Sequence, residues 1–210
     1  MILLIKNVLP SHWIENLEQV SCKLANIVKE RECHIGHMTR GKHAAVRFRS
    51  IIERGGSGKN CHSLDNIRLG DFIVKNRKLW NYISVLFALI CPQEAKILLL
   101  MLQELRIFGS MFTAGYWNLE PLYNLHRDTC DGRWCCAIAF GNFTDGMLDF
   151  PVINTSVGIQ RCDICFFWSK KLYHMVIDAD PTRQTFILTN HTAVLQHYNT
   201  DVLHECYDHQ

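Results

Sequence analysis

Residues 172–189 read LYHMVIDADPTRQTFILT, two apolar runs on either side of a short polar stretch. Both runs, LYHMVI and RQTFILT, are rich in β-branched and aromatic residues and therefore predict strands. The DADPT stretch between them predicts a turn, because aspartate and proline favour turn conformations. We expect this turn to close a hairpin that places Arg183 and Thr185 on the strand next to His174.

Runs of the same kind fill the rest of the second half of the chain. After Gly109 they read MFTAGYWNL, WCCAIAFGNF, MLDFPVI and DICFFWS, separated by turn residues. Together with the first two runs they make six short strands in about ninety residues. This pattern predicts an antiparallel barrel or sandwich.

The first half of the chain predicts helices instead. Apolar residues recur every three or four positions over 11–31, as in an amphipathic helix whose apolar stripe faces the core. A second helix is expected over 92–107, because Pro92 favours the first helical position and Gly109 favours a helix end. The apolar run at the amino terminus, interrupted by Lys6, predicts a first buried strand. The expected fold class is α+β, with helices that support an antiparallel β core.

Length and composition limit the class of protein. The chain of 210 residues is 48% hydrophobic and 20% charged, which predicts one globular domain. Its longest apolar stretch begins at Trp80 and is broken by Pro92 and charged neighbours, so neither side of the break is long enough to cross a bilayer. Since no signal peptide is expected either, we predict an intracellular protein without a membrane partner. The ten cysteines are then expected to be reduced thiols, mostly in the core.

Charge is distributed unevenly, although the net charge is only +2. Residues 40–80 contain ten Lys or Arg and three acids, a balance of +7, whereas residues 120–210 contain six and eleven, a balance of −5. The basic segment fits either a surface that faces phosphate groups or a solvated, loop-rich face. Its GGSGK run is not a phosphate-binding loop, because Glu53 and Asn60 stand where that motif needs Gly and Ser or Thr.

His126, Arg127 and Asp128 raise the question of a metal site or a catalytic loop. A protein-kinase catalytic loop needs Asn five residues after the aspartate, and position 133 is Arg. In an extended segment, however, His126 and Asp128 share a face and can bind one cation together. His174 offers a third ligand, because an imidazole in an apolar strand is costly to bury without a partner.

Two histidines and one carboxylate form the facial triad of non-heme Fe(II) oxygenases, which leaves three positions open on octahedral iron. A bidentate 2-oxo acid and dioxygen can occupy those positions. Arg183 and Thr185 offer a guanidinium fork and a hydroxyl to the far carboxylate of such an acid. The residues therefore predict Fe(II) and 2-oxoglutarate as cofactors.

Structural zinc is the competing metal hypothesis. Cysteines and histidines occur together at 33–37 and 61–62, but without the paired spacing of zinc sites. Cys162 and Cys165 are spaced as half of such a site but lie in a predicted strand, where residues three apart face opposite ways. We therefore expect these cysteines to be core residues.

With these residues in place, the segment 112–194 resembles the double-stranded β-helix (jelly-roll) core of the 2-oxoglutarate/Fe(II)-dependent dioxygenases. Among these enzymes, it is similar to the fungal TET/JBP-like oxygenases. The residues that carry the resemblance are Asn118, His126-Arg127-Asp128, FGNFTDGMLDFP (140–151), Gly158, RCDICFFWSKKLYH (161–174) and PTRQTFIL (181–188). Two departures stand out: Thr185 replaces the commoner Ser, and Cys162-Asp163 replaces the Gly-Asp of many relatives.

The resemblance implies a single dioxygenase domain over 1–210. Its parts are a helical and basic region at 1–110, the double-stranded β-helix at 111–195 and a tail at 196–210. It further implies that the two histidines and the aspartate bind Fe(II), with 2-oxoglutarate on the Arg-x-Thr pair. No obligate protein partner is evident.

The implied substrate is the methyl group of a pyrimidine, such as 5-methylcytosine, in nucleic acid, with DNA as the expected partner of the basic segment. Tyr116, Trp117 or Trp134 would stack on the base, and Asn118 would contact it. The protein would be nuclear if the substrate is chromosomal. The same chemistry on a protein side chain or small molecule stays open as an alternative, as does a catalytically inactive nucleic-acid-binding module.

Overall fold

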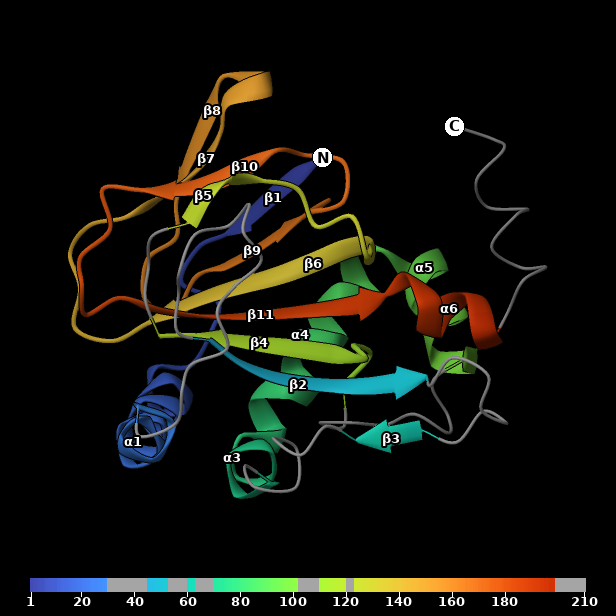
Figure 1. The fold of residues 1–210 in the computed structure, drawn as a ribbon, viewed down its shortest axis with the longest axis horizontal. Helices are drawn as coiled ribbons and strands as arrows, with labels where there is room; N and C mark the ends of the chain where they lie inside the picture. Colours follow the sequence, from blue (N-terminus) through green and yellow to red (C-terminus); the bar gives the residue numbers. More distant parts are fainter. Residues whose placement is uncertain (30–44, 53–59, 63–69, 102–109, 120–122, 199–210) are drawn as a thin grey trace.

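The computed structural model describes residues 1–29, 45–52, 60–62, 70–101, 110–119 and 123–198, in which two antiparallel sheets lie next to a layer of helices (Figure 1). In spatial order, the larger sheet consists of β1 (Ile2–Ile5), β9 (Ile164–Phe167), β6 (Asp131–Phe140), β11 (Gln184–His191), β4 (Ala114–Asn118), β2 (Ala45–Ile52) and β3 (Asn60–His62). The smaller sheet consists of β5 (Tyr123–His126), β10 (His174–Ile177), β7 (Met147–Phe150) and β8 (Thr155–Gly158).

Helices cover the face of the larger sheet that points away from the smaller one (Figure 1). They are α1 (Ser11–Lys29), α3 (Gly70–Lys75), α4 (Arg77–Ile90) and α5 (Pro92–Met101), and a short α6 (Thr192–Tyr198) follows β11. The buried residues of α4 recur at helical spacing and include Leu79, Trp80, Ile83 and Phe87. This stripe forms the contact with the sheet.

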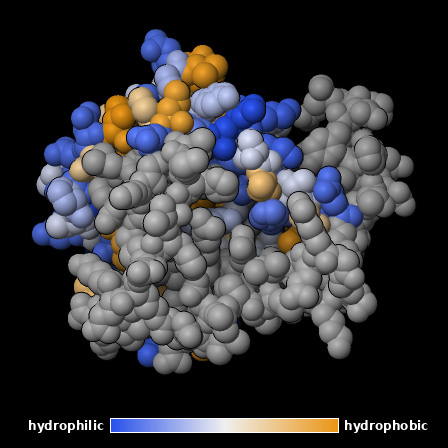
Figure 2. Space-filling view, in the orientation of Figure 1, coloured by the Kyte–Doolittle hydropathy of each residue, from blue (hydrophilic) through white to orange (hydrophobic). Residues whose placement is uncertain are grey.

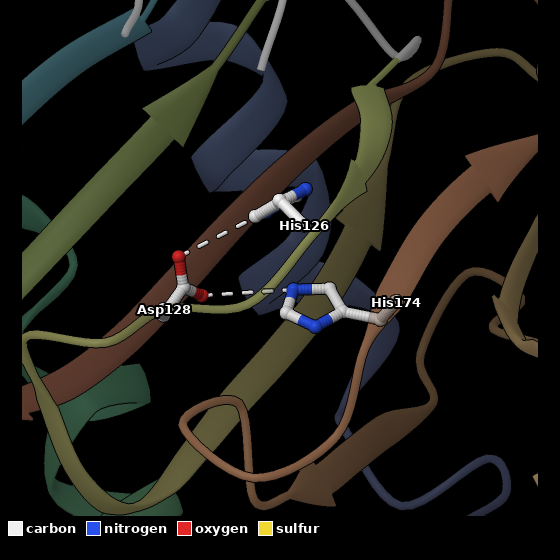
Figure 3. A group of neighbouring side chains, drawn as sticks. All are labelled: His126, Asp128 and His174. Atoms are coloured by element: carbon white, nitrogen blue, oxygen red, sulfur yellow. Dashed lines mark ion pairs between the residues drawn. The ribbon is translucent and has the colours of Figure 1, made fainter. Parts of the chain in front are cut away.

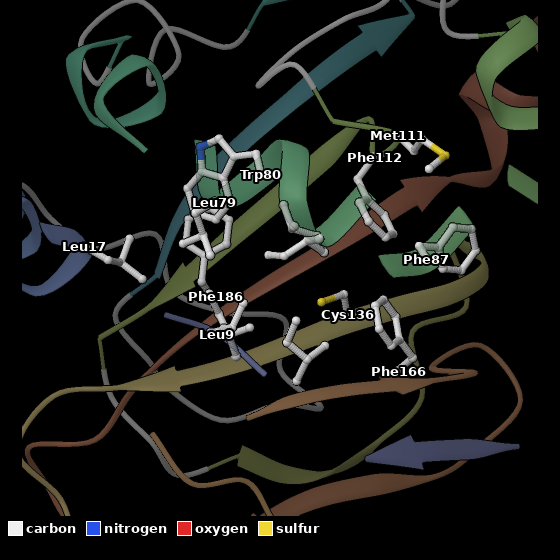
Figure 4. Close-up of a cluster of buried hydrophobic side chains, with 14 of the residues drawn as sticks. Leu9, Leu17, Leu79, Trp80, Phe87, Met111, Phe112, Cys136, Phe166 and Phe186 are labelled. Carbon is white, nitrogen blue, oxygen red and sulfur yellow. The ribbon is translucent and has the colours of Figure 1, made fainter. Parts of the chain in front are cut away.

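Aromatic rings dominate the core between helices and sheet (Figure 4). Phe72 of α3 stacks on Trp117 of β4 with ring centroids 5.4 Å apart, and Trp80 of α4 stacks on Phe186 of β11 at 4.7 Å. These four side chains are fully buried. Removing such a ring costs about 3–5 kcal/mol, so this layer holds the larger sheet in place.

A second core fills the space between the two sheets. The larger sheet contributes small side chains to it, Cys135, Ala137, Ala139 and Cys165, and the smaller sheet contributes Leu148 and Phe150. Successive residues of a strand face opposite ways. On β11, Phe186 and Leu188 therefore face the helices, whereas Thr185 and Ile187 face the interior.

The hairpin of β7 and β8 projects from the smaller sheet (Figure 1). A short 3₁₀ helix, η1 (Pro151–Ile153), joins the two strands, and Asn154 after it has a positive φ of 49°. Val152 and Ile153 at the tip are exposed, and Figure 2 shows hydrophobic side chains on the surface in this region.

The predicted fold class is confirmed. Each of the six predicted strand segments contains a strand, and α1 and α5 begin where the sequence predicts helices at 11 and 92. The strand predicted at the amino terminus is β1, although its side chains are only partly buried. The sequence analysis assigned no helix to α4 and no strand to β2, β3 or β8.

The hairpin predicted around residues 178–182 is wrong. β10 pairs with β5 and β7, whereas β11 pairs with β4 and β6, so the turn carries the chain from one sheet to the other. Arg183 and Thr185 therefore do not lie on the strand next to His174. A local turn sequence does not reveal such a switch, because the strand partners come from distant parts of the chain.

The described cysteines are free thiols, as predicted. Burial raises the pKa of Cys135 and Cys136, and raises that of Cys165 to about 12, so these thiols stay protonated at neutral pH. The cysteine and histidine groups at 33–37 and 61–62 lie outside the residues whose side chains are described. Within the described part of the chain, no helix is long and apolar enough to span a membrane.

Candidate metal centre

Three side chains meet on the smaller sheet (Figure 3). His126 ends β5, His174 begins β10, and the two residues are direct partners in the antiparallel pairing of these strands. Asp128 follows two residues after His126. One ligand atom from each residue lies within 4.8 Å of the others, with Asp128 Oδ1 3.8 Å from His126 Nε2 and Asp128 Oδ2 3.6 Å from His174 Nε2.

Backbone carbonyls orient both imidazoles in the same way. His126 Nδ1 lies 2.7 Å from the carbonyl of Asn124, and His174 Nδ1 lies 2.9 Å from the carbonyl of Leu172. A neutral imidazole that donates from Nδ1 keeps the lone pair of Nε2 available. Both Nε2 atoms face Asp128, so the group presents two nitrogens and a carboxylate to one point.

A buried hydrogen-bond relay joins the two segments that supply these ligands. The backbone N–H of Asp128 donates to the carbonyl of Ser169 at 3.0 Å, and the Ser169 hydroxyl donates to Asp131 Oδ2 at 2.8 Å. The backbone N–H of Asp131 donates back to the carbonyl of Asp128 at 2.9 Å. Ser169 is fully buried and lies in the segment that leads to His174. The relay therefore fixes Asp128 relative to that histidine.

Apolar side chains enclose His174 on the inner side. The ring of Phe167 lies 5.0 Å from the imidazole, and the ring of Phe150 lies 6.2 Å from it. His174 is only 5% exposed. Because these walls exclude water, charges brought to the centre interact more strongly than they would in solvent.

Arg183 lies just before β11, on the opposite sheet from the histidines. It is 1% exposed, and its Nε and Nη1 atoms have no hydrogen-bond partner in the part of the chain that the structure describes. Burial lowers the pKa of Arg183 to about 10. Two residues later, Thr185 is also buried, and its Oγ1 accepts a hydrogen bond of 3.3 Å from Asn118 Nδ2.

A buried guanidinium with two unsatisfied nitrogen atoms is unusual, because desolvation disfavours its charge. Among the described residues, no ion pair includes Arg183. Donor atoms left in this state are suited to a bidentate anion such as a carboxylate. The interior between the sheets therefore has a group that could hold a metal ion on one wall and a group that could bind an anion on the other.

Comparison with solved structures identifies the fold. NgTET1, solved in complex with 5mC DNA, shares 20% sequence identity with this chain, over 92% of this chain and 73% of that one, with a TM-score of 0.71. The chain has the NgTET1 fold. The double-stranded β-helix predicted from the sequence is thereby confirmed. No family model and no curated protein matches the chain.

Two prolyl hydroxylases are similar at lower TM-scores. The viral collagen prolyl hydroxylase of Paramecium Bursaria Chlorella virus-1 has a TM-score of 0.42 and a Pseudomonas putida prolyl-4-hydroxylase has one of 0.48, each at 13% identity over 90% of this chain. The aligned regions cover 93% and 92% of those chains, respectively.

Within this NgTET1-like fold, two of the predicted substrate residues are misassigned. Trp117 is fully buried against Phe72 on the helix side of the larger sheet, with its Nε1 donating to Gln184. Trp134 lies in the same core and packs edge-to-face on Phe87. Neither ring is available to stack on a base, because helices cover this face of the sheet.

Tyr116 and Asn118 face the other way, since they alternate with Trp117 along β4. Both are partly exposed. Asn118 lies opposite Thr185 in the β4–β11 pairing and donates a hydrogen bond to it, so it contacts a residue of the candidate anion-binding group. Its predicted role as a substrate contact stays a prediction, and so does that of Tyr116.

Most side chains of the basic segment predicted to face phosphate lie outside those that the structure describes. Of its ten basic side chains, the described ones are Lys75, Arg77 and Lys78, at the junction of α3 and α4, and they are exposed. The phosphate-facing role stays a prediction.

Sequence analysis missed the residues that support the two groups. Ser169 is an ordinary residue in a loop, and nothing in its neighbourhood marks it as a hydrogen-bond bridge. Gly146 had a detectable signal, because it belongs to the FGNFTDG run. It has a φ of 128°, and a Cβ atom there would lie 2.8 Å from Arg183 Cδ. Only glycine combines this backbone conformation with so close an approach.

Proposed function

We propose that this chain is an Fe(II)- and 2-oxoglutarate-dependent dioxygenase. The observation that carries the proposal is the convergence of His126, Asp128 and His174 on one point, opposite a buried Arg183 whose Nε and Nη1 atoms have no hydrogen-bond partner among the described residues. The NgTET1-like fold supports it.

The donor set fits iron. Two imidazole nitrogens and one carboxylate, with the remaining positions open, are the ligand type of non-heme Fe(II) oxygenases. A structural zinc site would be closed by four protein ligands, and the group in the described part of the chain has three. When bound, Fe(II) and 2-oxoglutarate supply the oxidation of a substrate C–H bond by dioxygen, with decarboxylation to succinate.

The anion group fits the far carboxylate of 2-oxoglutarate. Arg183 presents unpaired N–H groups, which match two carboxylate oxygens in one plane. Thr185 Oγ1 already accepts a hydrogen bond from Asn118, so its own proton is available for donation to the same carboxylate. Bound there, the acid would neutralise the charge that burial makes costly.

The protein residues orient the reactants and exclude water. The backbone carbonyls that hold both imidazoles by Nδ1 preset the Nε2 atoms for the metal, so little reorganisation is needed on binding. Phe150 and Phe167 keep solvent from the inner side of His174. A dry, preset site favours oxidation of the bound substrate over side reactions.

For the substrate, we propose a methylated pyrimidine in DNA. The similar structure of NgTET1 was solved with 5mC DNA, which supports this choice. Oxidation of such a base requires that it leave the stack and enter the protein. Tyr116, partly exposed on the inner side of β4, is the best remaining candidate for stacking on it. The basic segment would hold the phosphates, and a chromosomal substrate would place the protein in the nucleus.

The test is an anaerobic titration of the apoprotein with Fe(II) and then 2-oxoglutarate, followed by the visible charge-transfer band of the ternary complex. We expect the band in wild type and its loss in His174→Ala and Arg183→Ala. Lys6→Ala is the control, because Lys6 is an exposed cation that follows β1, and this variant should retain the band. A folded wild-type protein without a band would overturn the proposal.

Substrate choice is tested separately by succinate release with oligonucleotides. A methylated cytosine duplex should stimulate succinate formation, whereas the unmethylated duplex should not. Binding should weaken steeply with salt if phosphates are contacted. If neither duplex stimulates succinate formation although the band is intact, the proposed cofactors would stand and the proposed DNA substrate would be wrong.

A further inference from the structure

The loop 141–146, between β6 and β7, packs against the turn that precedes β11. The Thr182 hydroxyl donates to the carbonyl of Asn142, and the backbone N–H of Asp180 donates to the carbonyl of Asp145 at 3.4 Å. The base of the loop is held as well, since the N–H of Gly141 donates to Glu18 Oε1 at 3.0 Å. The loop is thus tied to the residues immediately before Arg183.

Two loop residues enclose the Arg183 side chain. Gly146 approaches its stem so closely that a Cβ atom would lie 2.8 Å from Cδ and 3.1 Å from Nε. Farther out, the Phe143 ring lies 5.4 Å from the guanidinium carbon Cζ. Phe143 also packs against the core between the sheets, which fixes the ring itself. The stem and the head of Arg183 therefore contact the same loop.

The Phe143 ring is suited to stabilise the positive charge of Arg183, which has no carboxylate beside it among the described residues. An aromatic face attracts a cation, and the attraction is larger where water is excluded. Arg183 is 1% exposed, and no ion pair within the described chain involves it. A ring over the face of a guanidinium leaves its N–H groups pointing outward in the plane, where a carboxylate accepts them in pairs.

We propose that Phe143 is a positioning residue for the 2-oxo acid: it holds the Arg183 guanidinium in the orientation that receives the far carboxylate. This inference rests on the proposed function, because it assumes that Arg183 binds that carboxylate. Without the ring, the guanidinium would have freedom that binding must remove, at a cost in affinity for the acid. Groups that chelate the metal would not be affected.

The experiment compares two 2-oxo acids in the Fe(II)-loaded protein by anaerobic titration of the charge-transfer band. 2-Oxoglutarate has a far carboxylate, whereas pyruvate has only the metal-chelating part. Phe143→Leu keeps an apolar side chain but removes the aromatic face, and Phe143→Tyr keeps the face. We expect Phe143→Leu to weaken 2-oxoglutarate binding about tenfold, with pyruvate binding unchanged, and Phe143→Tyr to stay within about twofold of wild type.

Each other outcome has a distinct meaning. Equal 2-oxoglutarate affinity in wild type and Phe143→Leu would overturn the positioning role and leave the proposed function intact. Equal weakening of both acids would also overturn it, because a loosened fold does not distinguish the far carboxylate. Absence of the band in wild type itself would instead remove the proposed function. Thermal unfolding of each variant verifies that it is folded before titration.

Discussion

Replacing Arg183 with methionine should stabilise the apoprotein while abolishing 2-oxoglutarate binding. Burial lowers the pKa of Arg183 from its ordinary value to about 10, so its charge is disfavoured in the folded state. At about 1.4 kcal/mol per pKa unit, keeping the guanidinium charged at neutral pH costs about 3 kcal/mol. The Phe143 ring offsets about 1 kcal/mol of this. Methionine keeps the unbranched stem beside Gly146, so we expect a net gain of about 2 kcal/mol.

Differential scanning fluorimetry at pH 7 measures this gain as a rise in Tm of roughly 4–8 °C for a domain of this size. In wild type, saturating Mn(II) and 2-oxoglutarate should raise Tm further, by mass action, whereas the variant should not respond to the acid. The cost is fully present at neutral pH, where the guanidinium is charged in the folded and the unfolded chain, and is relieved as the pH rises above about 10, because the folded protein releases its proton first.

Arg161→Met is the matched control. Arg161 pairs with Glu18 through two contacts of 2.9 Å, so its removal breaks a compensated pair and should lower stability by up to about 1 kcal/mol. An Arg183→Met apoprotein that melts at or below the wild-type temperature would refute the reasoning. It would mean that the buried guanidinium is already compensated without an anion.

Three further changes test separate parts of the structure. Gly146→Ala should displace the Arg183 stem and abolish the 2-oxoglutarate effect on Tm. An unchanged effect would show that the loop 141–146 moves to make room for the added methyl group. Ser169→Ala should weaken Fe(II) binding about 10-fold, measured by competition with a chelator, because it removes the hydroxyl bond to Asp131 that supports the backbone hydrogen bond between Ser169 and Asp128. Although burial opposes it, hydrogen bonds from an arginine and a backbone amide hold the pKa of Glu18 below 4.5. Wild type should therefore be more stable than Glu18→Gln at pH 7, with the difference lost as the pH falls through that lowered pKa; a difference that does not shrink as the pH is lowered would contradict this.

The sequence predicted the strands and the ligand group because both depend on short-range patterns. Alternating apolar residues mark strands, and His126 with Asp128 two residues later share a face of an extended segment whatever the topology. The third ligand, His174, was found from its chemistry, as a polar group in an apolar run. These inferences need no knowledge of which strands are neighbours.

The errors have a common cause in tertiary structure. Trp117 was expected to reach substrate, but helices that come from the first half of the chain cover its side of β4. Neighbouring residues of a strand face opposite ways, so Tyr116 and Trp117 could not both have faced the site. The helix α4 was missed because its apolar residues run into those of α5 and hide the helical period.

The wrong hairpin has the largest consequence. Because the chain changes sheets between β10 and β11, the proposed metal ligands and Arg183 belong to opposite walls of the double-stranded β-helix. A 2-oxo acid held at both ends would connect two walls that are otherwise joined by apolar packing and connecting loops. Cofactor loading should then slow hydrogen exchange in β5 and β10 together with the start of β11. Binding of the cofactors would thus make the two sheets more rigid relative to each other.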